Sequence, residues 1–286
     1  MKISERFEKL ALGKSATIGI GLGNDDVHNQ KILDATIIFL KKFNVNIVLF
    51  GTDISTAHIR SSIEGDSEIY QRIKYITTNQ PEEKIIEYLL ENKINAVIRG
   101  SLSSSAFLKR VKIEFKISEI NRLTLVETFG KYQFFYGPVG IDECNTLERK
   151  KQFIEKALIM FQRLKIPPRI SILSGGRKGD VGRDERVDQT IEMAMKLEKY
   201  YNETKPELEI FHDEILIEQA IEKQANLIIA PDGISGNLIY RTLVHLGGGN
   251  AYGAIYMDLD KVIIDTSRVG QSSEILGALL LALAIC

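Results

Sequence analysis

Residues that bind metals or form disulfides are scarce in this chain of 286 residues. The two cysteines, Cys144 and Cys286, lie far apart and form no Cys-x-x-Cys spacing. This pattern excludes a disulfide framework and a zinc knuckle. We expect no metal site either, because the four histidines are scattered without the spacing of metal ligands: His28, His58, His212 and His245.

The net charge is also small, and the apolar runs are short. A formal net charge of -1 argues against nonspecific nucleic-acid binding, so any anion site must be local. The apolar run Ile275–Ile285 is too short to cross a bilayer and is expected to form a buried helix. The first fifteen residues are amphipathic and charged, unlike a signal peptide. We therefore expect a cytoplasmic protein with no membrane or nucleic-acid partner.

Strand and helix patterns alternate along the whole chain. Residues 17–23 and 46–50 read as strands on either side of an amphipathic helix at 30–42, which is a βαβ unit and implies a parallel sheet. Further strands are predicted at 72–76, 95–98, 169–173, 227–230, 254–257 and 262–264, two more meet near Gly130, and helices are predicted at 81–91, 146–165, 185–201, 214–224 and 237–246. The sequence predicts an α/β protein with three α/β/α layers and a mainly parallel sheet.

The carboxyl-terminal stretch holds the densest group of polar residues. Thr266, Ser267 and Arg268 follow the strand at 262–264, Ser272 or Ser273 can cap the last helix, and Glu274 falls in its first turn. Loops at the ends of parallel strands are where such sheets bind ligands, so an anionic ligand is the natural interpretation. The alternative is that Asp265 and Arg268 only pair to close a surface loop while the serines cap.

Three other loops have both a functional and a structural interpretation. Ser104 and Ser105, at a predicted helix start, could cradle a phosphate or cap redundantly. Lys178 lies in a glycine-rich basic loop that could equally be a flexible surface loop. The glycines of Gly19-x-Gly21-x-Gly23 are a weak signal for a nucleotide or S-adenosylmethionine, and could serve only a tight turn.

Four spaced motifs together resemble the phosphotransacetylase and phosphotransbutyrylase family. They are Asn226–Asp232 at a strand end, Gly236-Asn237 at a helix start, the Gly247–Gly249 turn, and Asp265-Thr266-Ser267-Arg268. Within that family the sequence resembles a group from methanogenic archaea that is labelled methyltransferase mtx subunit X. That label names a context and no demonstrated reaction.

The resemblance implies a fold and an assembly. The expected fold is that of the isocitrate and isopropylmalate dehydrogenases, with two domains around a cleft: residues 1–120 plus 266–286, and residues 121–265. It also implies a homodimer. Coenzyme A would be a substrate, and no tightly bound cofactor is expected.

The resemblance also implies roles for individual residues. Ser267, Arg268 and Glu274 would be catalytic, with Arg268 neutralising charge, Ser267 donating to the reacting carbonyl and Glu274 accepting the thiol proton. Contacts to phosphate or substrate would come from Ser104, Ser105, Arg110, Lys178, Asp232 and Asn237. Three departures weaken this reading, since Glu274 replaces an aspartate, Phe107 replaces an acidic residue, and an Arg-Lys-x-Lys-Gly segment has no counterpart.

Three hypotheses follow. The first is a phosphate acyltransferase-like enzyme that acts on a phosphorylated or coenzyme A-linked small molecule. The second is a methyltransferase, or an accessory subunit of methyl transfer, linked to methanogenesis. The third is a ligand-binding relative that has lost turnover.

Overall fold

The computed structural model describes residues 2–63, 68–268 and 270–286. The chain divides into two compact units, one made of Ile3–Ile120 with Ala251–Cys286 and the other of Asn121–Asn250. We call them unit 1 and unit 2. From the sequence, the chain is expected to leave the second domain and re-enter the first at residue 266. In the structure the chain re-enters unit 1 at Ala251, because the strand ending at Asp265 pairs with a strand of that unit.

The strands of unit 1 run in the order β3-β2-β1-β4-β11-β10. All neighbouring pairs from β3 to β11 are parallel, and only β10 runs antiparallel to β11. Their bounds are β1 Thr17–Gly21, β2 Asn46–Gly51, β3 Ile73–Thr77, β4 Ala96–Ile98, β10 Asn250–Tyr256 and β11 Val262–Asp265. The mainly parallel α/β class predicted from the sequence is confirmed.

Helices follow the parallel strands of unit 1. They are α1 Ile3–Ala11, α2 Asp26–Lys42, α3 Asp53–Ser61, α4 Glu68–Gln71, α5 Pro81–Leu90, α6 Ser104–Glu114 and α11 Ser272–Ile285. Apolar faces of α5 and α6 bury against the sheet in a core that includes Phe50, Ile85 and Phe107. Phe107, one of the departures from the family pattern, is therefore a core residue.

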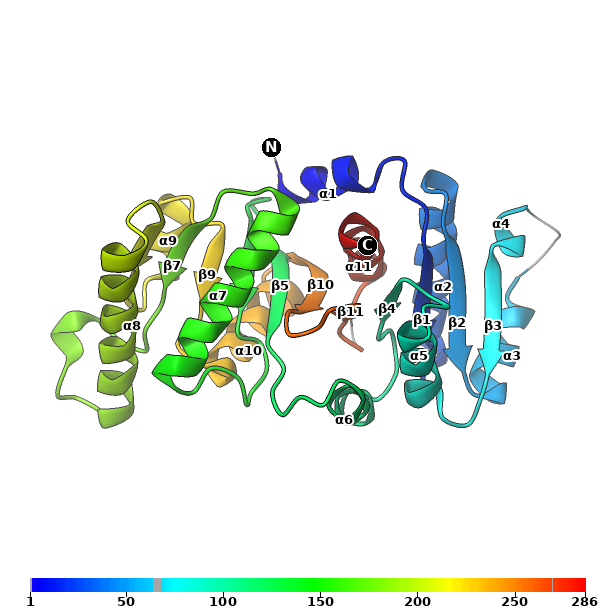
Figure 1. Cartoon of the computed structure of the whole chain (residues 1–286), viewed down its shortest axis with the longest axis horizontal. Coiled ribbons are helices and arrows are strands. Elements are labelled where there is room, and N and C mark those ends of the chain that lie inside the picture. Colours follow the sequence, from blue (N-terminus) through cyan, green and yellow to red (C-terminus); the bar gives the residue numbers. More distant parts are fainter. Residues whose placement is uncertain (1, 64–67, 269) are drawn as a thin grey trace. The chain divides into compact units, whose positions relative to one another are not determined.

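The last helix is central to unit 1. Eleven of its residues, from Glu274 to Ile285, are buried, as expected for a run that is apolar all round. It packs against α1 and α2 (Figure 1). Lys14 caps its carboxyl end, donating to the carbonyl oxygens of Ala284 at 2.8 Å and Cys286 at 2.9 Å.

Unit 2 has the strand order β5-β6-β9-β7-β8, with β5 and β6 antiparallel and the other pairs parallel. Its strands are β5 Arg122–Glu127, β6 Gln133–Gly137, β7 Arg169–Ile172, β8 Glu209–His212 and β9 Leu227–Ile229. Its helices are α7 Leu147–Leu164, α8 Glu185–Thr204, α9 Ile217–Glu222 and α10 Gly233–Arg241, with shorter turns at Lys178–Asp180 and Thr242–Leu246.

Two predicted elements of unit 2 are wrong in detail. The helix predicted at 214–224 is the shorter α9, and the strand β8 before it was missed. The helix predicted at 237–246 begins four residues earlier, at Gly233, because Asp232 caps it: the Asp232 carboxylate accepts from the Ser235 amide at 2.8 Å.

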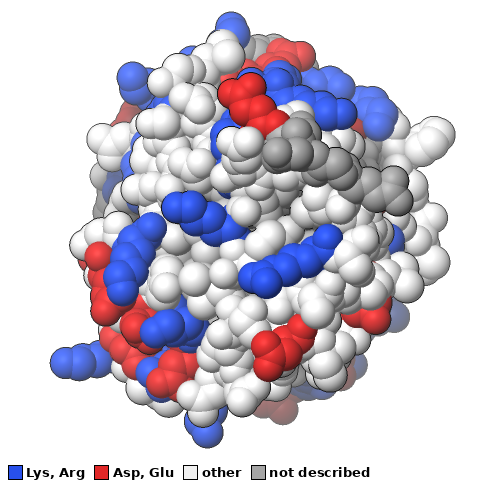
Figure 2. Space-filling view, turned by 90° about the vertical axis from the view of Figure 1, so that its right-hand side faces the viewer, with Lys and Arg blue, Asp and Glu red and all other residues white. Residues whose placement is uncertain are grey.

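Surface and composition features agree with an ordinary globular protein. Among the described residues, no helix is both long and apolar enough to span a membrane. Within the same residues no group of three or more metal-ligating side chains comes together. On the face shown in Figure 2, basic and acidic side chains are interspersed.

Candidate functional site

The carboxyl ends of β1, β4 and β11 meet at one edge of the unit 1 sheet. The three strands are parallel neighbours, with Ile20 paired to Ile98 and Ile98 paired to Ile264. The loops that follow them lead into α2, α6 and α11, so three helix amino termini begin at this edge. We call this region the unit 1 edge. It is the place where open parallel sheets bind ligands.

Arg99 organises the unit 1 edge. It is buried directly after β4, and its Nε donates to the Asp265 carboxylate. Its other nitrogens donate to the carbonyl oxygens of Leu102, at 2.6 Å, and Thr266. Asp265 therefore pairs with Arg99, a partner that the sequence analysis did not consider. Arg99 ties the loop after β4 to the loop after β11.

Ser267 and Glu274 are brought together as the sequence predicts for neighbours at a helix start. The Ser267 amide donates to Glu274 Oε1 at 2.8 Å, and Glu274 is only 3% exposed. Gly270 makes room for this carboxylate, because a Cβ at Gly270 would lie 2.1 Å from Glu274 Oε2. The carboxylate is therefore held in one position across the turn that starts α11.

Cationic groups flank this turn. Arg268 is exposed, and Lys31 of α2 reaches the turn with its Nζ 3.4 Å from the Gly270 carbonyl oxygen. Helix α11 starts at Ser272 with Gln271 at the N-cap, and the Gln271 side chain makes no capping hydrogen bond. The expectation that Ser272 or Ser273 caps this helix is wrong. An uncapped helix start beside two cations favours an anion.

Ser104, Ser105 and Arg110 all lie on α6. The cap is Ser103, whose Oγ accepts from the Ala106 amide at 3.5 Å, so Ser104 and Ser105 are the first residues of the helix. Arg110 lies two turns further on and is paired with Glu83 and Glu114, both at 2.8 Å. It would have to leave two carboxylates to bind a phosphate.

Gly21, the last residue of β1, and Gly23, two residues later, allow close packing of the backbone. A Cβ at Gly21 would lie 2.7 Å from the Arg99 carbonyl oxygen, and one at Gly23 would lie 2.3 Å from that of Ser101. The Gly23 amide donates to Ser101 Oγ at 2.6 Å. Close packing against the loop after β4 therefore explains why glycine stands at these two positions, and this is the structural interpretation given from the sequence.

His28 is a feature of this edge that sequence reasoning missed. It lies in the first turn of α2, where its amide donates to the capping Asp25 at 3.0 Å, and it is only 2% exposed. Among the described residues, neither ring nitrogen has a hydrogen-bond partner. Burial, together with Lys31 and Arg99, lowers the pKa of His28 below its usual 6.5, although Asp25 opposes this. The imidazole is therefore neutral near pH 7.

Unit 2 holds the remaining predicted residues. Asp232 caps α10 and lines a pocket of about 570 Å³ that also includes Arg186 and Thr190. Asn237 donates from Nδ2 to the Val139 carbonyl oxygen at 2.8 Å, which fastens α10 to the loop after β6. Lys178 is exposed in the loop between β7 and α8.

A buried lysine near this pocket was also missed. Lys150 of α7 is fully buried and donates to the Pro231 carbonyl oxygen at 2.5 Å. Burial lowers the pKa of Lys150 from 10.5 to about 8, with Cys144 and Asp232 acting against the shift. The periodic pattern of α7 indicates which face is buried, but it does not indicate a lysine on that face.

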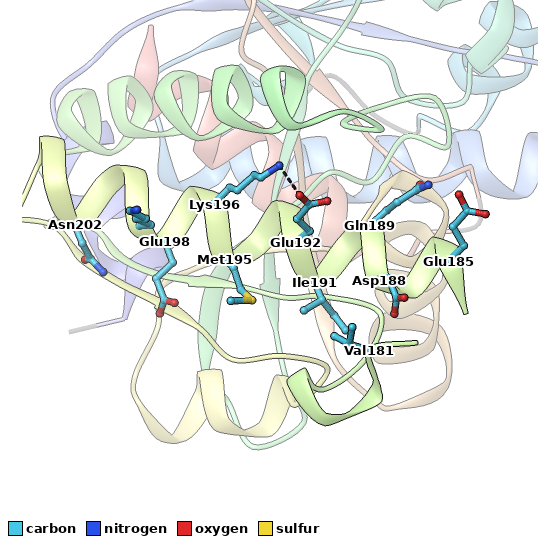
Figure 3. A pocket seen from close by; sticks show the side chains of 11 residues that line it. Val181, Glu185, Asp188, Gln189, Ile191, Glu192, Met195, Lys196, Glu198 and Asn202 are labelled. Carbon is cyan, nitrogen blue, oxygen red and sulfur yellow. Dashed lines mark ion pairs between the residues drawn. The ribbon is translucent and has the colours of Figure 1, made fainter. Parts of the chain in front are cut away.

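A second hollow of about 850 Å³ runs along α8 (Figure 3). Apart from Val181, its lining comes from that one helix, and it includes Met195 and the ion pair of Glu192 with Lys196, at 2.6 Å. No residue predicted for the site lines it. It is a surface groove with mixed charges.

Comparison with known proteins identifies a family and a full-length relative. Residues 24–283 match the family described as Phosphate acetyl/butaryl transferase. A Methanosarcina mazei protein with the provisional name methyltransferase mtx subunit X is 38% identical over 93% of this chain and 89% of its own length.

Solved structures agree on the fold. A branched-chain phosphotransacylase from Enterococcus faecalis superposes with a TM-score of 0.69 at 16% identity, covering 94% of this chain and 98% of that one. An isocitrate dehydrogenase from Methylococcus capsulatus gives a TM-score of 0.53 at 10% identity, covering 93% and 84%. The predicted fold type is confirmed.

Proposed function

Since the chain belongs to the phosphate acetyl/butyryl transferase family, we propose that it transfers an acyl group between an acyl phosphate and the thiol of coenzyme A. The phosphoryl group binds at the unit 1 edge. One observation carries this proposal: the Ser267 amide and the Glu274 carboxylate meet at the uncapped start of α11, beside the exposed Arg268.

The proposed chemistry assigns one task to each of these residues. The thiol sulfur attacks the carbonyl carbon, the bond from that carbon to the bridging oxygen breaks, and phosphate leaves. Arg268 neutralises the phosphoryl oxygens, as a guanidinium group does well. The Ser267 hydroxyl donates to the carbonyl oxygen, where negative charge develops. Glu274, whose Oε1 accepts from the Ser267 amide, takes the thiol proton.

The other predicted contact residues differ in whether they already make structural hydrogen bonds. Ser104 and Ser105 lie at the start of α6, on the loop that Arg99 ties to Thr266, so they are proposed as further phosphoryl contacts. In unit 2, Asp232 and Asn237 already make structural hydrogen bonds. We therefore assign the contact with coenzyme A phosphates to the exposed Lys178. We retain a homodimer as part of the proposal.

The direct test is an assay of acyl transfer from acetyl, butyryl and branched acyl phosphates to coenzyme A, on the wild type and on Arg268→Ala. We expect measurable turnover with one of these donors and a loss of about a hundredfold in kcat/KM for the variant, the size found when one charge-stabilising donor is removed.

Arg60→Ala is the matched control. Arg60 is also exposed on unit 1, but it lies in the last turn of α3 over the Tyr75 ring, at 4.8 Å. It should retain full activity. Wild-type protein that binds none of these donors and turns none over would contradict the proposal. Binding without turnover would instead favour a ligand-binding relative.

A methyl-transfer role is the second candidate, and it is favoured by the provisional name of the Methanosarcina mazei relative. The packed glycines after β1 speak against an S-adenosylmethionine site there. Calorimetry with S-adenosylmethionine, beside coenzyme A and acetyl phosphate, separates the two candidates. Binding of S-adenosylmethionine alone would replace the acyltransferase proposal.

A further inference from the structure

The imidazole of His28 has an unusual status at the unit 1 edge. It is almost completely buried, yet neither of its ring nitrogens has a hydrogen-bond partner among the described residues. A buried polar group left without a partner destabilises a fold, so such groups usually have one. Within residues 2–63, 68–268 and 270–286, this ring is therefore a buried polar group without a hydrogen-bond partner.

The surroundings of His28 indicate the charge of that partner. Lys31 lies one turn further along α2, and Arg99 lies at the end of β4, within electrostatic range of the ring. Lys31 also contacts the Gly270 carbonyl oxygen, and the Gly270 amide donates to the Ser267 carbonyl oxygen at 3.1 Å. His28 thus belongs to the same group of residues as the start of α11. Two cations beside an uncapped helix start attract an anion.

The acidic groups around the ring are few. Asp25 caps α2, and Asp265 is already paired with Arg99. From the packed helix α11 the one ionisable side chain is Glu274, which accepts from the Ser267 amide. From α3, His58 faces Asp26 at 3.8 Å. An incoming dianion would add two negative charges to this balance and favour the protonated imidazole.

We propose that His28 is a phosphoryl-binding residue of the unit 1 edge, whose ring donates to an anionic oxygen of the substrate and takes up one proton when a dianionic phosphoryl group binds. This inference rests on the proposed function, because it places the phosphoryl group at that edge. The ring has no hydrogen bond that would have to break for it to turn toward the ligand. Such a residue selects the phosphoryl dianion over a carboxylate, which carries a single charge.

Sulfate is the right probe, because it stays a dianion between pH 6 and pH 8 and any proton taken up must bind to the protein. Calorimetry in two buffers with different ionisation enthalpies counts that proton. We expect wild-type protein to take up a sizeable fraction of a proton near pH 7. Its sulfate affinity should rise as the pH falls from 8 to 6, by at most about tenfold for each pH unit.

His28→Gln is the informative variant, because its amide can donate a hydrogen bond but cannot take up a proton. We expect it to match the wild type near pH 8, to fall about tenfold or more behind it near pH 6, and to take up no proton. His58→Gln, a change of the other histidine in this half of unit 1, should behave as the wild type does. Equal proton uptake by wild type and His28→Gln would overturn the inference.

A measurement on the wild-type protein tests the inference without depending on whether the variant folds. The NMR titration of the His28 ring should show its pKa raised when sulfate is added, and a pKa that sulfate does not move would overturn the inference. Sulfate and phosphate binding without this linkage leaves the proposed function standing. Failure to bind sulfate, phosphate or acetyl phosphate would remove both proposals.

Discussion

Helix starts that follow parallel strands differ between unit 1 and unit 2. In unit 2, helices α8 and α10 begin with Asp184 and Asp232, whose carboxylates accept from the first free amides of each helix. In unit 1, the N-cap residue of α11 is Gln271, whose side chain makes no capping hydrogen bond, and the His28 ring has no hydrogen-bond partner in the part of the chain that the structure describes. The carboxylates at the starts of α8 and α10 thus supply negative charge that Gln271 does not supply at α11, which is where the proposed anion would bind.

The two units also differ in how they accommodate a buried basic side chain. At the unit 1 edge the buried guanidinium of Arg99 is balanced by a carboxylate, Asp265. In unit 2 the buried amine of Lys150 donates to a carbonyl oxygen. A carbonyl oxygen does not neutralise an ammonium group, so burial lowers the pKa of this lysine to about 8. One unit holds a paired charge and the other holds an amine that loses its charge easily.

The largest expected effect comes from breaking the pair in unit 1. Arg99→Leu removes the guanidinium and leaves the buried Asp265 without its counterion, which should cost about 3 to 5 kcal/mol in the free energy of unfolding. It should also abolish sulfate binding, because the loops after β4 and β11 lose their link. Urea unfolding measures the stability change.

Arg99→Leu combined with Asp265→Leu is the control, because no charge is then left buried. The double variant should recover much of the lost stability without recovering sulfate binding. A single variant that loses less than about 1 kcal/mol would show that the pair does not organise this edge.

The next effect concerns Lys150. Its pKa is about 8 in the folded protein and 10.5 when unfolded, so between these values the unfolded chain binds more protons. The free energy of unfolding should therefore rise with pH from about 8 to 10.5, by about 3 kcal/mol at 1.36 kcal/mol per pKa unit. Lys150→Met should remove this rise, while Lys151→Met, at the neighbouring half-buried lysine of α7, should keep it. Identical pH profiles in both variants would contradict the lowered pKa.

The sequence predicted the parts of this comparison that depend on periodicity. The parallel strands, the buried last helix and the gathering of Ser267 and Glu274 at its start all follow from apolar runs bounded by turn residues. Strand β8 was missed because it has only four residues at the sheet margin, and Glu209 at its start is exposed. Short edge strands carry too little apolar pattern to be separated from a neighbouring helix.

Arg99 and His28 show what pattern reasoning leaves out. Ile98 pairs with Ile264, so Arg99 and Asp265 occupy matching positions, each one residue after this pair. That signal was present but required the strand order, which the sequence alone did not provide. His28 needed more, because its missing partners become visible only when every neighbouring polar atom has been placed.

A smaller effect tests the capping in unit 2. Asp232→Ala should cost about 1 kcal/mol in the free energy of unfolding, as loss of an N-cap carboxylate usually does. Gln271→Ala in unit 1 should cost only a few tenths of that, because the Gln271 side chain caps nothing. Denaturant titration of both variants measures the difference. Equal losses would show that the two helix starts are satisfied alike, and the comparison would then fail.

The smallest effect on stability comes from a variant that also tests whether the start of α11 binds the anion. Gln271→Asp places at α11 the kind of cap that unit 2 uses, which should stabilise the ligand-free protein by about 0.5 kcal/mol or slightly more. The new carboxylate would occupy the space and the charge of the ligand, so sulfate affinity should fall at least about tenfold. Gln271→Asn separates these effects, because its amide can cap without adding charge and should weaken sulfate binding far less. If the aspartate variant gains stability and still binds sulfate as the wild type does, the anion binds elsewhere, and the absent cap at α11 has no role in ligand binding.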